Sequence, residues 1–166
     1  MNGKGQNLTG LFIETVDRNR TAMFRLAYSI VLNKEDAEDV VSESILKAYS
    51  HLAELKDAKK IKAWLFQIIA NESKTCLRKR KRIELTEDPS LFSAKEDTTE
   101  TPYGLLDCVY QLGESFREVI LLYYFEEFRV KEIARILAIS EGTVKSRLSR
   151  AREALKEALE QNNQKG

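Results

Sequence analysis

The sequence predicts an all-α fold built as two small helical domains. Apolar residues recur at three- and four-residue steps in several segments, which is the spacing of an amphipathic helix. Alternating apolar and polar residues bounded by hairpin turns, the pattern of β-strands, are absent along the 166 residues. One polar stretch without sustained apolar spacing separates the helical segments, so we expect the helices to form two groups.

Helical spacing marks three segments of the first domain. The first covers residues 21–32, and the second begins after Asn33, a residue type that caps helix N-termini. Acidic residues in the first turn of the second segment stabilise a helix there, because they interact favourably with the positive end of the helix dipole. The third segment covers residues 61–82. The core residues expected in this domain are Met23, Phe24, Ala27, Ile30, Val31, Ala37, Val40, Val41, Ile45, Ala48, Trp64, Leu65, Ile68, Ile69 and Leu77.

The polar stretch at residues 83–101 is expected to be a flexible acidic linker. It holds six acidic residues against one lysine, with a proline and several Ser and Thr residues. The net charge of +1 hides an uneven layout, because residues 1–82 contain 16 Lys and Arg against 10 Asp and Glu. Residues 102–166 contain ten of each. A basic excess in the first domain is the charge pattern expected of a polyanion-binding protein.

The second domain is expected to open with a strongly apolar helix over residues 115–128. Ser115 and Glu118 have the spacing of a capping box, in which each side chain bonds the backbone amide of the other residue. We therefore expect the helix to begin at Ser115.

A helix, a tight turn and a second helix follow over residues 130–155. Ile133, Ala134 and Leu137 line one side of the first helix. Ser140 is expected to cap the second helix, and Ile139 just before it can pack on Val144. At about 100° per residue, one face of the second helix gathers apolar residues that we expect to be buried. These residues are Val144, Leu148, Ala151 and Leu155.

The opposite face of this second helix carries hydroxyl groups and cations. Short hydroxyls and cations on a projecting helix can reach base edges in the DNA major groove, and flanking arginines can reach phosphates. The pattern therefore predicts a helix-turn-helix that binds DNA, whereas a solvated basic helix without a partner is the plainer alternative. The predicted contact residues are Thr143, Lys145, Ser146, Arg147, Ser149, Arg150 and Arg152.

The segment EIARILAISEGTVKSRLSRAREAL closely resembles the promoter-reading helix-turn-helix of extracytoplasmic-function (ECF) sigma factors of bacterial RNA polymerase. YQLGESFREVILLYYFEEF, DAEDVVSESILKAY and KAWLFQIIANESKTCLRKRKR resemble further segments of that family, in the family's order. The resemblance implies a sigma-70 region 2 type domain at 8–82, a linker at 83–101 and a region 4 type domain at 102–162. The chain departs from the family at Ser42, Thr75, Gly113 and Ala138, where Gln, Asp, Pro and Gly are frequent.

The resemblance also implies roles for the first domain. The helix DAEDVVSESILKAY would bind the large subunit of the polymerase, with Asp36, Asp39, Val40, Ser42 and Glu43 as the contact residues. The loop at residues 52–61 and the helix after it would capture an unpaired base of the downstream promoter element, while the basic end of that helix meets phosphates. The expected downstream contacts are Lys56, Lys59, Lys60, Asn71, Lys74, Arg78, Arg80 and Arg82.

These implications define an expected function. The protein would be a sigma factor that directs core RNA polymerase to specific promoters and assists promoter opening. Its expected partners are core polymerase, promoter DNA and an anti-sigma factor, often membrane-anchored in the family, that releases it on stress. We expect a cytoplasmic monomer without cofactor, metal or membrane insertion. No enzymatic activity is expected, because a single histidine supports no catalytic triad and no glycine-rich phosphate loop is present.

Two alternatives remain open from the sequence. An autonomous helix-turn-helix regulator, whose N-terminal domain senses a ligand or dimerises, would bind a palindrome without polymerase. A decoy that keeps the fold without reading DNA would lose nothing when Lys145 and Arg150 are replaced.

Overall fold

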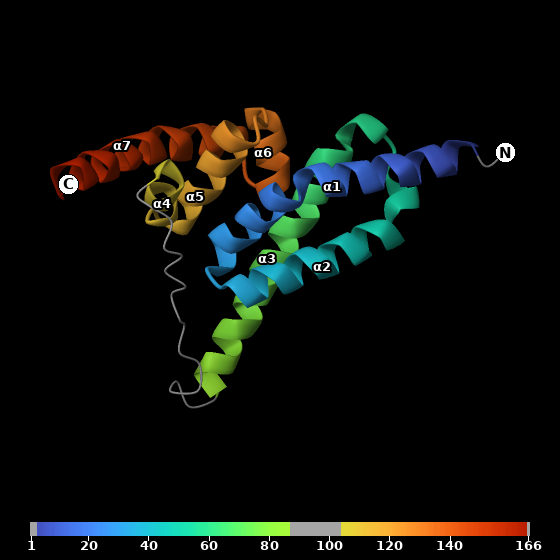
Figure 1. Cartoon of the computed structure of the whole chain (residues 1–166), viewed down its shortest axis with the longest axis horizontal. Helices are drawn as coiled ribbons and strands as arrows, with labels where there is room; N and C mark the ends of the chain where they lie inside the picture. The colour runs from blue at the N-terminus through green and yellow to red at the C-terminus, as the bar shows by residue number, and fades with distance from the viewer. Residues whose placement is uncertain (1–2, 87–103, 166) are drawn as a thin grey trace. The chain divides into compact units, whose positions relative to one another are not determined.

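The computed structural model of the chain describes residues 3–86 and 104–165. Within these two ranges every regular element is a helix, and the predicted all-α class is confirmed (Figure 1). The described helices fall into two compact units, one with α1 to α3 and the other with α4 to α7. Most of the expected linker, residues 87–101, lies outside the described residues.

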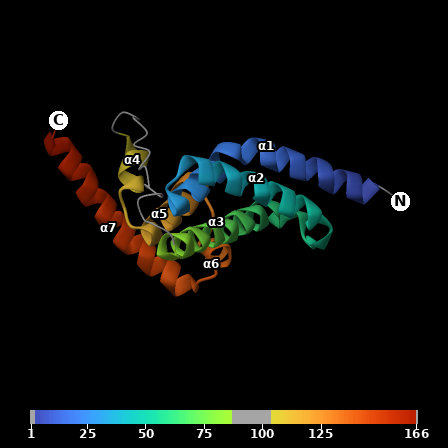
Figure 2. The ribbon, with the colours of Figure 1, turned by 90° about the horizontal axis from the view of Figure 1, so that it is seen from below.

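The first unit is a three-helix arrangement in which each long helix contacts the other two (Figures 1 and 2). Asn33 caps the second helix as predicted, since its side chain accepts a hydrogen bond of 2.9 Å from the backbone N–H of Asp36. The core is built around Met23, Leu26 and Phe66, all of which are fully buried. The elements are α1 (Gly3–Val31), α2 (Lys34–Ser50), η1 (Leu52–Glu54), η2 (Ala58–Lys60) and α3 (Ile61–Thr86).

The expected core of this unit is largely confirmed. Most of the predicted residues are buried, and six are only half-buried because they lie at the edges of the helix faces. The half-buried residues are Phe24, Val41, Ile45, Trp64, Ile68 and Leu77.

Two helices are longer than the sequence predicted. The first begins at Gly3 instead of residue 21, and α3 continues to Thr86, so residues 83–86 are helical and not part of a linker. The added part of α1 is held by packing, since Phe12 and Val16 are buried. At the end of α3, where Leu85 is 88% exposed, lengthening an existing helix adds hydrogen bonds without a new nucleation cost.

The second unit is built on its last helix, which contacts α4, α5 and α6. The elements are α4 (Leu105–Tyr110), α5 (Glu114–Ile120), the π-helical turn η4 (Leu121–Phe125), α6 (Val130–Leu137) and α7 (Glu141–Lys165).

The predicted start of the apolar helix at Ser115 is wrong. Helix α5 begins one residue earlier, because the carbonyl of Gly113 already accepts hydrogen bonds from the amides of Phe116 and Arg117, both at 3.0 Å. Glu118 is only 2% exposed, so its side chain is buried in the unit and does not reach back to the backbone amide of Ser115 at the surface. The Ser-to-Glu spacing therefore matched a capping box by chance.

The helix-turn-helix forms as predicted. Helix α6 ends at Leu137, and the capping residue Ala138 has a φ of 55° in the left-handed region, which turns the chain toward α7. Ser140 caps α7, since its Oγ accepts a hydrogen bond of 3.1 Å from the amide of Thr143. The predicted apolar face of α7 is buried at Val144, Leu148 and Ala151, and half-buried at Leu155.

Candidate nucleic-acid interface

The first turns of α7 present polar side chains to solvent. Lys145, Ser146, Ser149 and Arg150 are all exposed, on the side of the helix away from the buried apolar face. Arg147 is half-buried at the edge of this group. The structure thus brings these predicted residues together on one face, where hydroxyls and cations are accessible to a ligand as base readout requires.

Thr143 has a different role from its neighbours. Its hydroxyl forms a hydrogen bond of 2.8 Å with the Ser140 hydroxyl, and its amide donates to the same oxygen. This amide is therefore already satisfied by the cap and is not available to a phosphate. A Cβ at Gly142 would meet only the Ser140 Oγ, at 3.9 Å, so the fold itself does not require glycine there.

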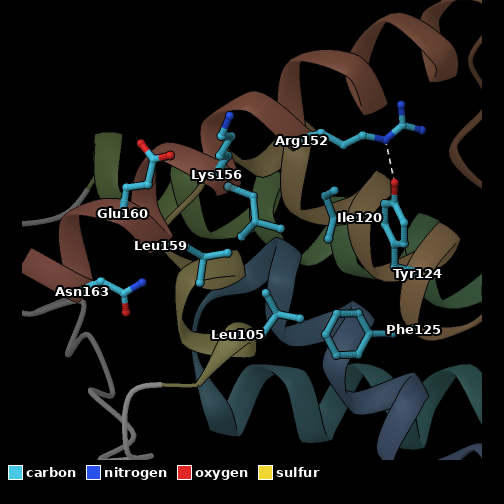
Figure 3. A pocket seen from close by; sticks show the side chains of 10 residues that line it. Leu105, Ile120, Tyr124, Phe125, Arg152, Lys156, Leu159, Glu160 and Asn163 are labelled. Atoms are coloured by element: carbon cyan, nitrogen blue, oxygen red, sulfur yellow. Dashed lines mark hydrogen bonds between the residues drawn. The ribbon is translucent and has the colours of Figure 1, made fainter.

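Arg152 is exposed like Lys145 and Arg150, but it also bonds a neighbouring element. Its Nε donates a hydrogen bond of 2.6 Å to the Tyr124 hydroxyl (Figure 3). Its guanidinium carbon also lies 6.0 Å and 5.9 Å from the ring centres of Tyr123 and Tyr124, a cation–π geometry. This contact fastens α7 to the π-helical turn, and the DNA contact of Arg152 stays a prediction.

An apolar groove of about 370 Å³ lies next to this contact in the second unit. Leu105, Ile120, Phe125 and Leu159 face it, and Lys156, Glu160 and Asn163 stand at its rim (Figure 3). The sequence did not predict this groove, because it is assembled from α4, α5, η4 and the second half of α7.

The downstream contact residues lie in two zones of the first unit. Lys56, Lys59 and Lys60 are exposed in the loop before α3. Arg78 and Arg82 are exposed near the far end of that helix. The rise of an α-helix separates Lys60 from Arg82 by about 33 Å, which is the length of about ten base-pair steps of duplex DNA. The predicted residues therefore form an extended track instead of a single cluster.

Most of the predicted residues of α3 share one face. At about 100° per residue, Arg78 and Arg82 fall within about 20° of Asn71 around the helix axis, and Lys74 lies about 60° from it. Arg80 falls on the opposite side, about 180° away. Arg80 indeed turns inward: it forms an ion pair with the carboxylate of Asp36 and donates a hydrogen bond of 2.9 Å to the carbonyl of Val31. Its position about 180° from Asn71 is the signal in the sequence that excludes Arg80 from the track.

The exposed face of α2 contains three of the five predicted polymerase contacts. Asp39, Ser42 and Glu43 are exposed together. Val40 is only 5% exposed and is a core residue, so its prediction as a surface contact is wrong. The side chain of Asp36 is engaged by Arg80. Leu46, which is not among the predicted contacts, is 71% exposed and lies one helical turn beyond Glu43 on the same face.

Cys76 lies in a groove between α2 and α3 that acidic side chains of α2 also line. Burial raises the pKa of its thiol, and the negative charges of Glu43 and Asp39 raise the pKa further. Among the residues that the structure describes, no group of three or more His, Cys, Asp or Glu side chains could hold a metal ion. Over the same residues, no helix has the length and hydropathy needed to span a bilayer.

Both units match known family models. Residues 15–83 match Sigma-70 region 2, and residues 104–155 match Sigma-70, region 4. The chain is 33% identical over 151 residues to the RNA polymerase sigma factor SigV of Bacillus subtilis (strain 168), across 89% of this chain and 90% of the relative. It is 32% identical to the ECF RNA polymerase sigma factor SigM of the same organism, across 81% and 86% of the two chains.

Solved structures agree with these relatives. The structure resembles the sigma factor RpoE in complex with the anti-sigma factor NepR from Bartonella quintana, with a TM-score of 0.74 and 28% identity over 96% of this chain and 98% of that one. It also resembles CnrH in complex with the cytosolic domain of CnrY, with a TM-score of 0.62 and 26% identity over 90% and 87% of the two chains.

Proposed function

Because the chain belongs to the ECF sigma factors of bacterial RNA polymerase, we propose that each of its helical units contacts a separate promoter element while core polymerase is bound. The protein directs core polymerase to specific promoters and assists their opening, as a regulatory protein without enzymatic activity of its own. We expect it to act in the cytoplasm, with the polymerase that it serves. The observation that carries this proposal is the exposed polar face of α7.

The upstream element is read by α7. Lys145, Ser146, Ser149 and Arg150 project from its first turns, while Val144 and Leu148 anchor the helix from behind. A rigid helix that presents cations and hydroxyls from one face fits the major groove, where each base pair shows a distinct pattern of donors and acceptors.

The downstream promoter element binds along the track of basic residues in the first unit. Lysines of the loop before α3 and the exposed arginines near its end neutralise phosphates along a track of about 33 Å. Binding of an unpaired strand along this track favours the melted promoter, because a base already out of the duplex costs less to capture than a stacked one.

Core polymerase binds the exposed face of α2. Asp39 and Glu43 supply negative charge on this face, which favours a basic partner surface. Leu46, which lies between Glu43 and the end of the helix, supplies an apolar contact to the partner. Since RpoE has been solved in complex with the anti-sigma factor NepR, we further propose that an anti-sigma factor controls this protein by covering one or more of these faces.

Run-off transcription with reconstituted holoenzyme tests the proposal. Replacing Lys145 or Arg150 with alanine should lower affinity for the upstream element by about 1 to 3 kcal/mol for each base that the side chain reads. Arg152→Ala is the matched control, because this neighbouring arginine bonds Tyr124 and should change stability more than base recognition.

A DNA-binding assay with the protein alone, compared with the transcription assay, separates the alternatives. Binding of a palindrome by the protein alone, without core polymerase, would favour an autonomous regulator. Promoter recognition that survives both Lys145→Ala and Arg150→Ala would contradict the reading role of α7.

A further inference from the structure

Asp36 and Arg80 were expected to bind two different partners, but the structure brings them to each other. Arg80 forms an ion pair with the carboxylate of Asp36, and its Nη1 donates a hydrogen bond of 2.9 Å to the carbonyl of Val31. One side chain of α3 thus contacts the last residue of α1 and the first turn of α2, at the turn between those helices, beside α3 (Figures 1 and 2).

The electrostatics of this junction explain the arrangement. Helix α1 has no basic residue in its own last turn, so the negative end of its dipole lacks a cation from its own sequence. Helix α2 begins with the exposed Lys34 and continues with Glu35 and Asp36, which suit its positive end but place negative charge beside the same turn. The guanidinium of Arg80 adds a positive charge that is more shielded from water and lies close to both helix ends.

The junction is also partly shielded from water. The side chains of Arg80 and Asp36 are 22% and 34% exposed, so their attraction is screened less than that of a surface pair. A guanidinium has donors on separate nitrogens in a fixed plane, so it can serve a carbonyl and a carboxylate at the same time. A single lysine ammonium at this position lacks that geometry.

From this geometry we infer that Asp36 and Arg80 are internal positioning residues, not contacts to polymerase or DNA. They fix the first turn of α2, which leads into the acidic polymerase-binding face, against the part of α3 that carries the basic track. The inference rests on the proposed function of those two faces and adds that their mutual geometry depends on one arginine.

Amide hydrogen exchange on the full chain tests the internal role. The amide of Leu32 bonds the carbonyl of Tyr28 in the last turn of α1, and the amide of Ala37 bonds the carbonyl of Asn33 in the first turn of α2. Arg80→Gln should speed exchange of both amides about tenfold or more, since removing a hydrogen bond to a charged group changes an opening equilibrium by that order. Asp36→Asn should speed the Ala37 amide in the same way.

Matched neighbours serve as controls. Arg78→Gln and Asp39→Asn remove the same charges from exposed positions on the same two helices and should leave both amides unchanged. The double variant Asp36→Asn with Arg80→Gln should speed exchange by less than the product of the two single effects, because both changes break one junction. If Arg80→Gln unfolds the unit, Arg80→Lys provides the measurement, with a smaller acceleration of the same amides.

The salt dependence of holoenzyme binding to promoter DNA separates the internal role from a phosphate contact. Arg78→Gln should flatten the slope of log affinity against log salt by about 0.7 to 0.9, whereas Arg80→Gln should leave the slope unchanged. An Arg80→Gln variant that flattens the slope as Arg78→Gln does, or that leaves both amides protected, would overturn the inference. A wild-type holoenzyme without promoter selectivity would instead overturn the proposed function, and the exchange result would still stand by itself.

Discussion

Ala138 adopts the left-handed backbone conformation, with φ 55° and ψ 47°, at the turn between α6 and α7. This conformation costs a residue with a Cβ about 1–2 kcal/mol of conformational free energy, which glycine does not incur. Glycine in turn gives the unfolded chain more conformational entropy, which lowers the stability of the folded state by about 0.4–1 kcal/mol. Ala138→Gly should therefore raise the free energy of unfolding of the second unit by about 0.5–1 kcal/mol. Urea unfolding followed at the amides of α7 measures this effect.

Ala154→Gly is the control for this prediction. Ala154 lies within α7, where the same substitution should lower stability by about 1 kcal/mol. Equal effects of the two substitutions would show that the conformation of Ala138 carries no strain.

Cys76 provides a prediction about pH. Its raised pKa keeps the thiol protonated at neutral pH, and the thiolate is the reactive form. Alkylation by iodoacetamide should therefore be slow at pH 8 and should accelerate only at a higher pH than for a free cysteine. Glu43→Gln removes one of the negative charges that raise this pKa, so it should lower the pKa and speed alkylation at pH 8.

Mass spectrometry of the alkylated peptides separates the two cysteines. Cys108 is buried and should stay unmodified while the second unit is folded. Alkylation of Cys76 that is fast at pH 7 and insensitive to Glu43→Gln would contradict the electrostatic account.

At the scale of the element, the start of α7 depends on its cap. Ser140→Ala removes the acceptor for the amide of Thr143 and should lower the stability of the second unit by about 1 kcal/mol. Ser140→Asp keeps an acceptor and should retain most of the stability. Ser149→Ala, at an exposed position of the same helix, should change stability by less than about 0.5 kcal/mol. Thermal unfolding compares the three variants, and a Ser140→Ala midpoint equal to that of Ser149→Ala would contradict the capping role.

The same elements show what local sequence could predict. The caps at Asn33 and Ser140 were predictable because a cap involves side-chain and backbone groups within three residues of each other. The cap predicted at Ser115 was wrong although the spacing of Ser115 and Glu118 fits a capping box, because the side chain of Glu118 is buried in the core. Local spacing alone does not show which polar side chain the tertiary structure buries.

Contacts between distant positions were not predictable. Arg80 and Asp36 are 44 positions apart, and Arg152 and Tyr124 are 28 apart, so nothing in the spacing joins either pair. The helical face of Arg80 could have excluded it from the basic track, but only the packing of α3 against the turn after α1 shows which groups it meets. The exposed polar face of α7 was predictable because a single helix defines both its buried and its exposed sides.

For the chain as a whole, the proposed function requires two separate contacts with one polyanion. The chain carries 27 basic and 26 acidic residues, so its net charge gives no general attraction to DNA. Some of the exposed cations lie on the first turns of α7 and along the track of the first unit, while others, such as Arg18, Lys47 and Lys131, lie elsewhere on the described residues. Two modest sites on one chain raise each other's effective concentration on a shared promoter, so each can be weak by itself.

This arrangement predicts additive losses when both sites are weakened. Combining Lys145→Ala and Arg150→Ala in α7 with Arg78→Gln and Arg82→Gln in α3 should lower holoenzyme affinity by the sum of the two separate free-energy losses, within about 0.5 kcal/mol. The α3 changes should flatten the salt slope by about 2 at most, while the sequence preference at the upstream element should respond only to the α7 changes. Competition binding with promoter and scrambled DNA over a salt series measures both quantities. A combined loss that departs from the sum by more than about 1 kcal/mol would mean that the two sites are coupled, because changes at independent sites on one DNA do not alter each other's contribution.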